Sequence, residues 1–332
     1  KHIDSEDKKN SRGIQSAFPK IRYSVRLKII LPYLLLSLLL AMGAGYVVSQ
    51  AAIDTIERRF VNNLIEVGKL TNAWLVEEEG NRLETMRQLA FTDGLAESVL
   101  ENNAVRTREL VLGLAINNQE EAIEILDLQG VALISIRHNA EGGPASFDFS
   151  KGENIFVEAD FVQKVLSQSS DDQGDKFAGL IQAPWGNYFY VAGPITNEQN
   201  QLVGAVLVGR SVPTMILETR ELLIGDENTF AHVSLYDPSG ISMGTTLIDI
   251  DNIDLPDETV TEIFERQANE SQTRPLNVSN INYREILAPW EVRGGQDIGL
   301  VGVALAESFL VSPGQQTQVQ IYILATLGLL MI

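Results

Sequence analysis

The sequence predicts an α+β protein with a long N-terminal helix, two antiparallel-sheet modules and flanking transmembrane helices. Three observations indicate this fold class. An uncharged apolar run begins at residue 29, and a helical pattern of apolar residues follows it. After that, an order of strand, turn, strand, helix and further strands occurs twice, which indicates an internal duplication.

The apolar run, residues 29–48, reads IILPYLLLSLLLAMGAGYVV and contains no charged residue. At a helical rise of about 1.5 Å per residue it reaches about 30 Å, the thickness of the hydrocarbon core of a bilayer. A buried core helix of this length would show a polar face. A cleaved signal peptide would have a shorter apolar region and a small-residue cleavage site, whereas Gln50 continues directly into a helical pattern. We therefore expect a retained transmembrane helix.

The charges on the two sides of this run predict its orientation. Residues 1–28 contain eight Lys and Arg against three Asp and Glu, whereas the whole chain has a net charge of −19. Basic residues next to a membrane span remain on the cytoplasmic side, where they face the anionic headgroups of the lipid bilayer. We expect residues 1–28 to be a cytoplasmic tail and the acidic remainder to be extracytoplasmic. That acidic charge argues against nucleic acid as a partner.

A second apolar segment closes the sequence. Residues 321–332 are apolar but too few to cross a bilayer alone. We expect residues 317–332 to be the truncated start of a second transmembrane helix, so that the protein passes the cell membrane twice. An output domain beyond residue 332 would then be cytoplasmic.

Residues 49–117 read as a stalk helix followed by short helices. The stalk, from Ala51 to about Leu89, has apolar positions spaced three or four apart: Ile53, Ile56, Phe60, Leu64, Val67, Leu70 and Trp74. This stripe packs either on its own domain or along a second copy, and its spacing fits the seam of a parallel homodimer. Shorter helices are expected over residues 95–101 and 104–115.

Residues 118–225 form the predicted membrane-distal module. Two apolar runs flank Asp127-Leu-Gln-Gly130, a pattern typical of a turn between strands. A loop with Gly142, Gly143 and Pro144 follows. The remaining elements are a helix near residues 160–166 and strands over residues 176–182, 188–195 and 202–210.

Residues 226–312 form the predicted membrane-proximal module. Its opening hairpin, residues 233–247, places Asp237-Pro-Ser-Gly240 where the first module has Asp127-Leu-Gln-Gly130. A helix is expected over residues 257–267 and strands over residues 283–288 and 299–306. Two short matches support the duplication: residues 202–204 (LVG) with 300–302 (LVG), and residues 192–194 (AGP) with 287–289 (LAP).

The residues indicate no catalytic or metal site within this chain. There is no cysteine, which excludes disulfides, thiolate metal sites and a catalytic cysteine. The three histidines, His2, His138 and His232, lie far apart in the sequence. Residues 249–254 are similar to a calcium loop but have Ile253 where an oxygen ligand belongs and no glycine at position six. We expect no cofactor.

Taken together, the spans, the stalk helix and the two D-x-x-G modules resemble a double-Cache domain, the PAS-like extracytoplasmic sensor of bacterial receptors. The resemblance covers about residues 49–312, and the opening residues 20–40 also resemble the start of membrane-bound sensor kinases and nucleotide cyclases. It implies a small-molecule ligand bound in the distal module. It also implies a signal that passes through the second span to a cytoplasmic histidine kinase, nucleotide cyclase or chemoreceptor region.

Five residues of the distal module are candidate ligand contacts: Arg137, Asp148, Trp185, Tyr188 and Tyr190. Arg137 ends an apolar strand and suits a carboxylate, and Asp148 lies in the loop expected to cover the sheet. Tyr188 and Tyr190 share one face of a strand. The alternative is that the aromatic residues belong to the core and the arginine to a solvated edge.

Other readings of the whole chain stay open. Amino-acid-binding relatives carry an Arg-x-Trp-Tyr run, whereas Trp185 here is preceded by Ala183-Pro184 and followed by Gly186, which argues against an amino-acid ligand. The region is alternatively a dimerising anchor of a membrane-bound enzyme without a ligand, or a surface module that binds another protein.

Overall fold

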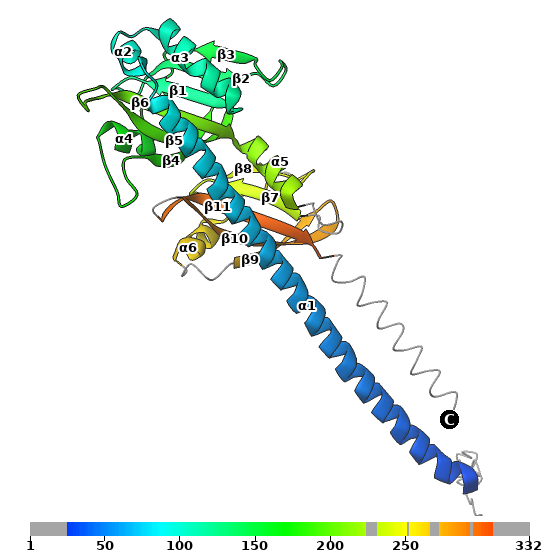
Figure 1. Ribbon diagram of the computed structural model, residues 1–332. Coiled ribbons are helices and arrows are strands. Elements are labelled where there is room, and N and C mark those ends of the chain that lie inside the picture. The colour runs from blue at the N-terminus through cyan, green and yellow to red at the C-terminus, as the bar shows by residue number, and fades with distance from the viewer. Residues whose placement is uncertain (1–24, 224–230, 251, 266–271, 293–294, 308–332) are drawn as a thin grey trace, which may run out of the picture. The chain divides into compact units, whose positions relative to one another are not determined.

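The computed structural model describes residues 25–223, 231–250, 252–265, 272–292 and 295–307 (Figure 1). The predicted tail up to residue 24 and the predicted second transmembrane helix lie outside the described residues. Of the described residues, 25–54 belong to one compact unit and those from residue 55 onward to another. The helices are α1 Val25–Ala90, α2 Leu95–Leu100, α3 Ala104–Asn117, α4 Asp160–Leu166, α5 Val212–Leu223 and α6 Asp257–Glu265.

Helix α1 includes both the predicted membrane span and the predicted stalk in one uninterrupted helix. Among the described residues it is the one helix that is long and apolar enough to cross a membrane. Within residues 29–48 its large apolar side chains are exposed, with Tyr33 and Tyr46 each 71% accessible. A helical segment that is apolar on all sides and not buried against the described residues is suited to lipid.

The first module is built on a six-stranded antiparallel sheet in the order β3-β2-β1-β6-β5-β4. Strand β3 was not predicted, and the expectation that Asp148 lies in a covering loop is wrong, because Asp148 pairs with Arg137 across β2 and β3. The glycine and proline residues before this short edge strand obscured it. The strands are β1 Ala122–Leu126, β2 Ala132–His138, β3 Phe147–Ser150, β4 Phe177–Ala183, β5 Gly186–Thr196 and β6 Leu202–Ser211.

The second module is built on a five-stranded antiparallel sheet in the order β8-β7-β11-β10-β9. Strand β9 was not predicted, because Arg274 and Pro275 interrupt its apolar pattern, and Pro is confined to edge strands such as this one. The strands are β7 Ala231–Tyr236, β8 Ser242–Thr245, β9 Gln272–Val278, β10 Ile281–Val292 and β11 Gln296–Ala306.

Strand register confirms one of the two sequence matches between the modules. Leu126, the last residue before the first D-x-x-G turn, pairs with Ala205, which in turn pairs with Pro194. In the second module, Tyr236 holds the place of Leu126 and pairs with Leu300. Leu300 pairs with Pro289, so residues 192–194 and 287–289 are equivalent.

The other match, between the two LVG segments, is three residues out of register. Gly204 lies where a Cβ would be 2.2 Å from the carbonyl oxygen of Leu126, and Gly299 lies where a Cβ would be 2.3 Å from that of Tyr236. Gly299, rather than Gly302, is therefore the counterpart of Gly204. Three small or apolar residues recur by chance, whereas the close approach of a backbone carbonyl requires glycine.

The main core lies between α1 and one face of each sheet. Phe60, Leu64 and Val67 of α1 are buried in it, together with residues of both modules such as Ile123 and Ile286. Much of the predicted stripe on α1 thus packs on its own domain, while Ile53 and Leu70 stay exposed. Helix α4 covers the outer face of the first sheet and α6 that of the second. Helix α5, which the sequence did not predict, contacts both modules.

Candidate functional site

The candidate site lies on the outer face of the first sheet and is centred on Arg137. All five N–H donors of its guanidinium are engaged. Nε and Nη2 donate to Glu124 Oε1 at 3.1 and 3.0 Å, and Nη1 donates to Glu153 Oε1 at 2.8 Å and to Ser150 Oγ at 3.4 Å. Nη2 also donates to Glu153 Oε2. A single arginine therefore holds two carboxylates.

Glu124 is the fixed partner of Arg137. It lies on the central strand β1 and is fully buried. The hydroxyl of Tyr190 donates a hydrogen bond of 3.0 Å to its Oε1. Burial raises the pKa of the Glu124 carboxyl to about 7, although the Arg137 charge opposes this shift. Glu124 Oε2 is buried without a hydrogen-bond partner.

Glu153 is the more accessible partner and follows strand β3 in a loop. Its side chain is 19% exposed and accepts hydrogen bonds from Ser135 Oγ at 2.7 Å and Ser150 Oγ at 2.6 Å. Partial burial would raise the pKa of this carboxyl, but the hydrogen bonds from Arg137 and the two serines outweigh it and lower the pKa. Glu153 is therefore held as a carboxylate.

Aromatic side chains form the wall of the site. The Arg137 guanidinium stacks on the indole of Trp185, with 3.5 Å between Cζ and the ring centroid. Tyr188 stacks on Tyr190 at 5.7 Å, and Phe156 meets the Tyr190 ring edge-on at the same distance. The Trp185 Nε1 atom is buried without a hydrogen-bond partner.

The structure brings four of the five predicted residues into this cluster. Arg137, Trp185 and Tyr190 are in direct contact, and Tyr188 joins them through Tyr190. Burial and the Glu124 carboxylate raise the pKa of the Tyr190 hydroxyl, and the Arg137 charge opposes this shift. Asp148 does not join them: its side chain is exposed and accepts a hydrogen bond from Asn139 Nδ2 at 3.3 Å.

Sequence reasoning missed the acidic half of the site, Glu124 and Glu153, and the serines that hold Glu153. One signal was available for Glu124. It stands alone in the otherwise apolar strand AIEIL, and an acidic residue in such a strand requires a buried cationic or hydrogen-bonding partner. Glu153 has no such signal, because its position depends on how the loop after β3 folds.

The second module contains a related triad on the equivalent face. Arg274 Nε donates to Glu285 Oε2 at 2.6 Å, and the Tyr236 hydroxyl donates to Glu285 Oε1 at 2.9 Å. The remaining contacts of Arg274 include the main-chain oxygens of Ile253 at 2.8 Å and Asp254 at 3.4 Å. Here main-chain carbonyls stand where the first module uses the side chain of Glu153.

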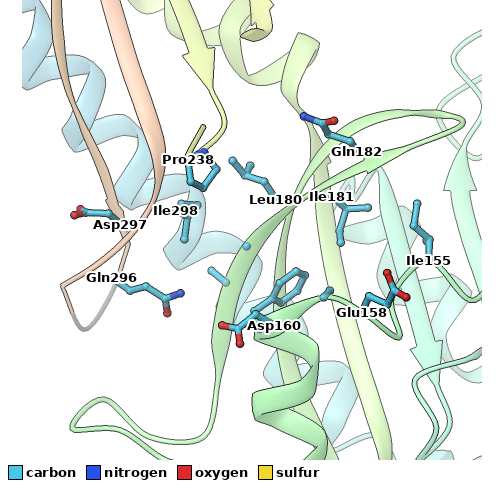
Figure 2. A pocket seen from close by; sticks show the side chains of 14 residues that line it. Ile155, Glu158, Asp160, Leu180, Ile181, Gln182, Pro238, Gln296, Asp297 and Ile298 are labelled. Atoms are coloured by element: carbon cyan, nitrogen blue, oxygen red, sulfur yellow. The ribbon is translucent and has the colours of Figure 1, made fainter. Parts of the chain in front are cut away.

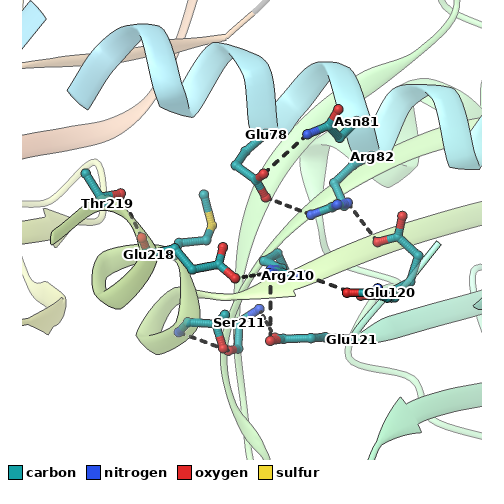
Figure 3. A network of polar contacts seen from close by, with 12 residues as sticks. Glu78, Asn81, Arg82, Glu120, Glu121, Arg210, Ser211, Glu218 and Thr219 are labelled. Carbon is teal, nitrogen blue, oxygen red and sulfur yellow. Dashed lines mark hydrogen bonds and ion pairs between the residues drawn. The ribbon is translucent and has the colours of Figure 1, made fainter. Parts of the chain in front are cut away.

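A polar network joins the first module to α1 and α5 (Figure 3). Arg82 of α1, whose side chain is 7% exposed, lies 2.7 Å from the buried carboxylate of Glu120, just before β1. At the end of β6, Arg210 pairs with Glu121 and with Glu218 of α5. Burial raises the pKa of Glu120, and the Arg82 charge opposes this shift. Ion pairs therefore connect the residues just before β1 to both helices.

A second feature is a cavity of about 440 Å³ at the seam between the two modules. Figure 2 shows Glu158 and Asp160 from the first module on one side and Gln296 and Asp297 from the second on the other. The three carboxylates are exposed, in contrast to Glu124. Their charge suits a cationic group better than an anionic one.

No family model and no curated protein matches the chain by sequence. Solved structures do match. The sensory domain of the Campylobacter jejuni chemoreceptor Tlp1 is 10% identical with a TM-score of 0.52, covering 78% of this chain and 99% of that one. The extracellular domain of a protein assigned as a histidine kinase is 12% identical with a TM-score of 0.53, covering 80% and 96%. The fold is that of a double-Cache sensor domain.

A further structural neighbour was solved with a ligand. The sensory domain of the Campylobacter jejuni chemoreceptor Tlp3, with isoleucine bound, is 9% identical with a TM-score of 0.50, covering 78% of this chain and 97% of that one. The predicted double-Cache fold is thus confirmed. At these identities the comparison establishes the fold, and the residues must indicate the ligand.

Proposed function

We propose that this chain is the extracytoplasmic sensory region of a two-pass membrane receptor. A small molecule binds at the Arg137 cluster of the first module, the membrane-distal one. The signal passes through the second span to a cytoplasmic output region. The fold, the apolar segment of α1 and the described functions of the structural neighbours support this proposal.

The observation that carries the proposal is the composition of the Arg137 cluster. A guanidinium lies between two carboxylates and an indole, and the buried Glu124 Oε2 and Trp185 Nε1 atoms lack hydrogen-bond partners. Buried polar atoms without partners are uncommon in folded proteins and mark places where a ligand can complete the hydrogen bonding. The second module satisfies its arginine with main-chain carbonyls and therefore suits a structural role.

Transmission from this cluster uses the buried network at the start of β1. Glu124 of the site and Glu120 of the network are four residues apart, and Glu120 pairs with Arg82 of α1. A ligand that shifts β1 changes the position of this ion pair relative to α1. Helix α1 continues into the predicted membrane span, so a small displacement can reach the bilayer.

The test is a thermal-shift screen of the full chain in detergent against amino acids, organic acids, amines and nucleobases. A ligand at one hundred times its dissociation constant adds about 2.7 kcal/mol to the free energy of unfolding and raises the melting temperature. We expect a hit that is lost in Arg137→Ala and kept in Arg274→Ala, which removes the arginine of the triad in the second module.

Two outcomes would contradict the proposed site. A hit that survives Arg137→Ala but disappears in Arg274→Ala would place the ligand in the second module. An amine that loses its effect only in Asp297→Asn would place it in the seam cavity, which that carboxylate lines. If no compound stabilises the protein, the dimerising and protein-binding alternatives gain support.

A further inference from the structure

The Arg137 guanidinium has no free donor for a ligand. Two of its five N–H groups point to Glu124, two to Glu153 and one to Ser150. A ligand carboxylate can therefore reach Arg137 only by displacing a group that already binds it. The two candidates for displacement differ in burial, attachment and chemical surroundings.

Glu124 cannot leave. It is fully buried on a central strand between β2 and β6, and the Tyr190 hydroxyl also binds it. Moving it would break the strand pairing of the sheet or leave a carboxylate without a partner among apolar side chains. Glu124 is therefore the permanent hydrogen-bond partner of Arg137.

Glu153 can leave. Its side chain is 19% exposed, and its main chain is fixed independently of the carboxylate. Its own carbonyl accepts a hydrogen bond of 2.8 Å from Ala132 N, and the neighbouring Gly152 N donates one of 2.7 Å to the Ala132 carbonyl. Rotation about the side-chain bonds would thus carry the carboxylate into solvent while the loop stays attached to β2.

The second module provides an internal comparison. Arg274, Glu285 and Tyr236 form a triad of the same residue types as Arg137, Glu124 and Tyr190, although they stand at different positions in their sheet. Main-chain oxygens of residues 253 and 254 complete the coordination of Arg274, and these cannot rotate away as a side chain can. The exchangeable carboxylate is thus a feature of the first module.

We propose that Glu153 occupies the place of a ligand carboxylate on Arg137, and that ligand binding is an exchange of one carboxylate for the other. The ligand class is therefore a carboxylate, bound bidentately by Arg137 with Ser135 and Ser150 as additional donors. This inference rests on the proposed function, because it assigns the chemistry of the same site. Release of Glu153 removes the side-chain link between the loop after β3 and the sheet, while the main-chain hydrogen bonds of the loop to Ala132 remain.

The test replaces the internal carboxylate with an external one. In the full chain in detergent, Glu153→Ala removes the occupant and leaves Arg137 with open donors. Sodium acetate is the probe, and sodium chloride at equal ionic strength is the control. We expect the Glu153→Ala variant to melt several degrees below wild type. Acetate should raise its melting temperature again, and this effect should saturate with acetate concentration. Wild type and the double variant Arg137→Ala/Glu153→Ala are expected to show no saturable effect.

A second variant keeps the test decisive if Glu153→Ala does not fold. Glu153→Gln keeps a side chain of similar size but removes the carboxylate that competes with acetate for Arg137. Acetate should then change the Trp185 emission with saturation, whereas the emission of wild type should show no saturable change. Equal responses to acetate and chloride in both variants, or an acetate effect that persists without Arg137, would overturn the inference.

The acetate experiment and the ligand screen can each fail while the other succeeds. Acetate tests the carboxylate subsite without the physiological ligand. The acetate experiment can therefore give a positive result even when no library compound binds. A ligand that binds the first module but leaves the acetate response absent would preserve the proposed function and reject the exchange.

Discussion

Gly209 on β6 pairs with Tyr190 on β5, and the tyrosine ring fills the space that a side chain on Gly209 would need. A Cβ at Gly209 would lie 2.3 Å from Tyr190 Cε1. The absent side chain lets Tyr190 lie across β6 and reach Glu124 on β1. The second module uses the same device, since a Cβ on Gly302 would lie 2.2 Å from Glu285 Oε1.

Gly209→Ala should therefore destabilise the first module. The added methyl group displaces the Tyr190 ring and weakens its hydrogen bond to buried Glu124, for a cost of about 1–3 kcal/mol, as is typical of overpacking. Urea unfolding followed by tryptophan emission measures it. Gly113→Ala is the matched control: a Cβ there has no atom within 4 Å, and in a helix interior the change should stabilise by about 0.5–1 kcal/mol.

Glu124 predicts a specific dependence of stability on pH. Its pKa is about 7 in the folded protein against an ordinary value of 4.5, so the folded state binds more protons between these values. The contribution of Glu124 to the free energy of unfolding therefore falls as pH rises from about 4.5 to 7. The fall is up to about 3 kcal/mol, at 1.36 kcal/mol per pKa unit.

Glu124→Gln isolates that contribution. The free energy of unfolding of wild type minus that of the variant should decline with pH across this window, because Glu120 and Glu285, whose pKa values burial also raises, titrate in both proteins. A flat difference between pH 4.5 and 7 would show that Glu124 does not titrate there. Glu153 has a lowered pKa, and its stabilisation is lost only at lower pH.

The elements that could be predicted from the sequence are those whose structure is determined by residues close together in the chain. The stalk helix, the D-x-x-G hairpins and α4 have periodicity or turn residues that physical rules interpret directly. Strand β3 and strand β9 are edge strands with polar residues, and their pairing is set by neighbours distant in sequence. Arg137 was found because a cation ends an apolar strand, whereas Glu153 becomes its partner only through the path of a loop.

The ion pair between Arg82 and Glu120 should be important for attaching α1 to the first module. Arg82→Met leaves the buried carboxylate of Glu120 without its cation, and such losses cost about 3–5 kcal/mol. Unfolding by urea measures the loss, and adding Glu120→Gln should recover much of it. Lys164→Met, which breaks the exposed pair with Asp160 on α4, should cost no more than about 0.5 kcal/mol.

The emission of Trp185 reports directly on whether a ligand binds at Arg137 in the first module. The indole stacks on the Arg137 guanidinium at 3.5 Å, so displacement of Glu153 by a ligand must change its surroundings. The measurement is the tryptophan emission of wild type minus that of Trp185→Phe during titration with each stabilising compound. If the ligand binds at Arg137, this difference changes with saturation at the concentrations that raise the melting temperature. A compound that stabilises the protein while this difference stays constant would contradict binding at Arg137.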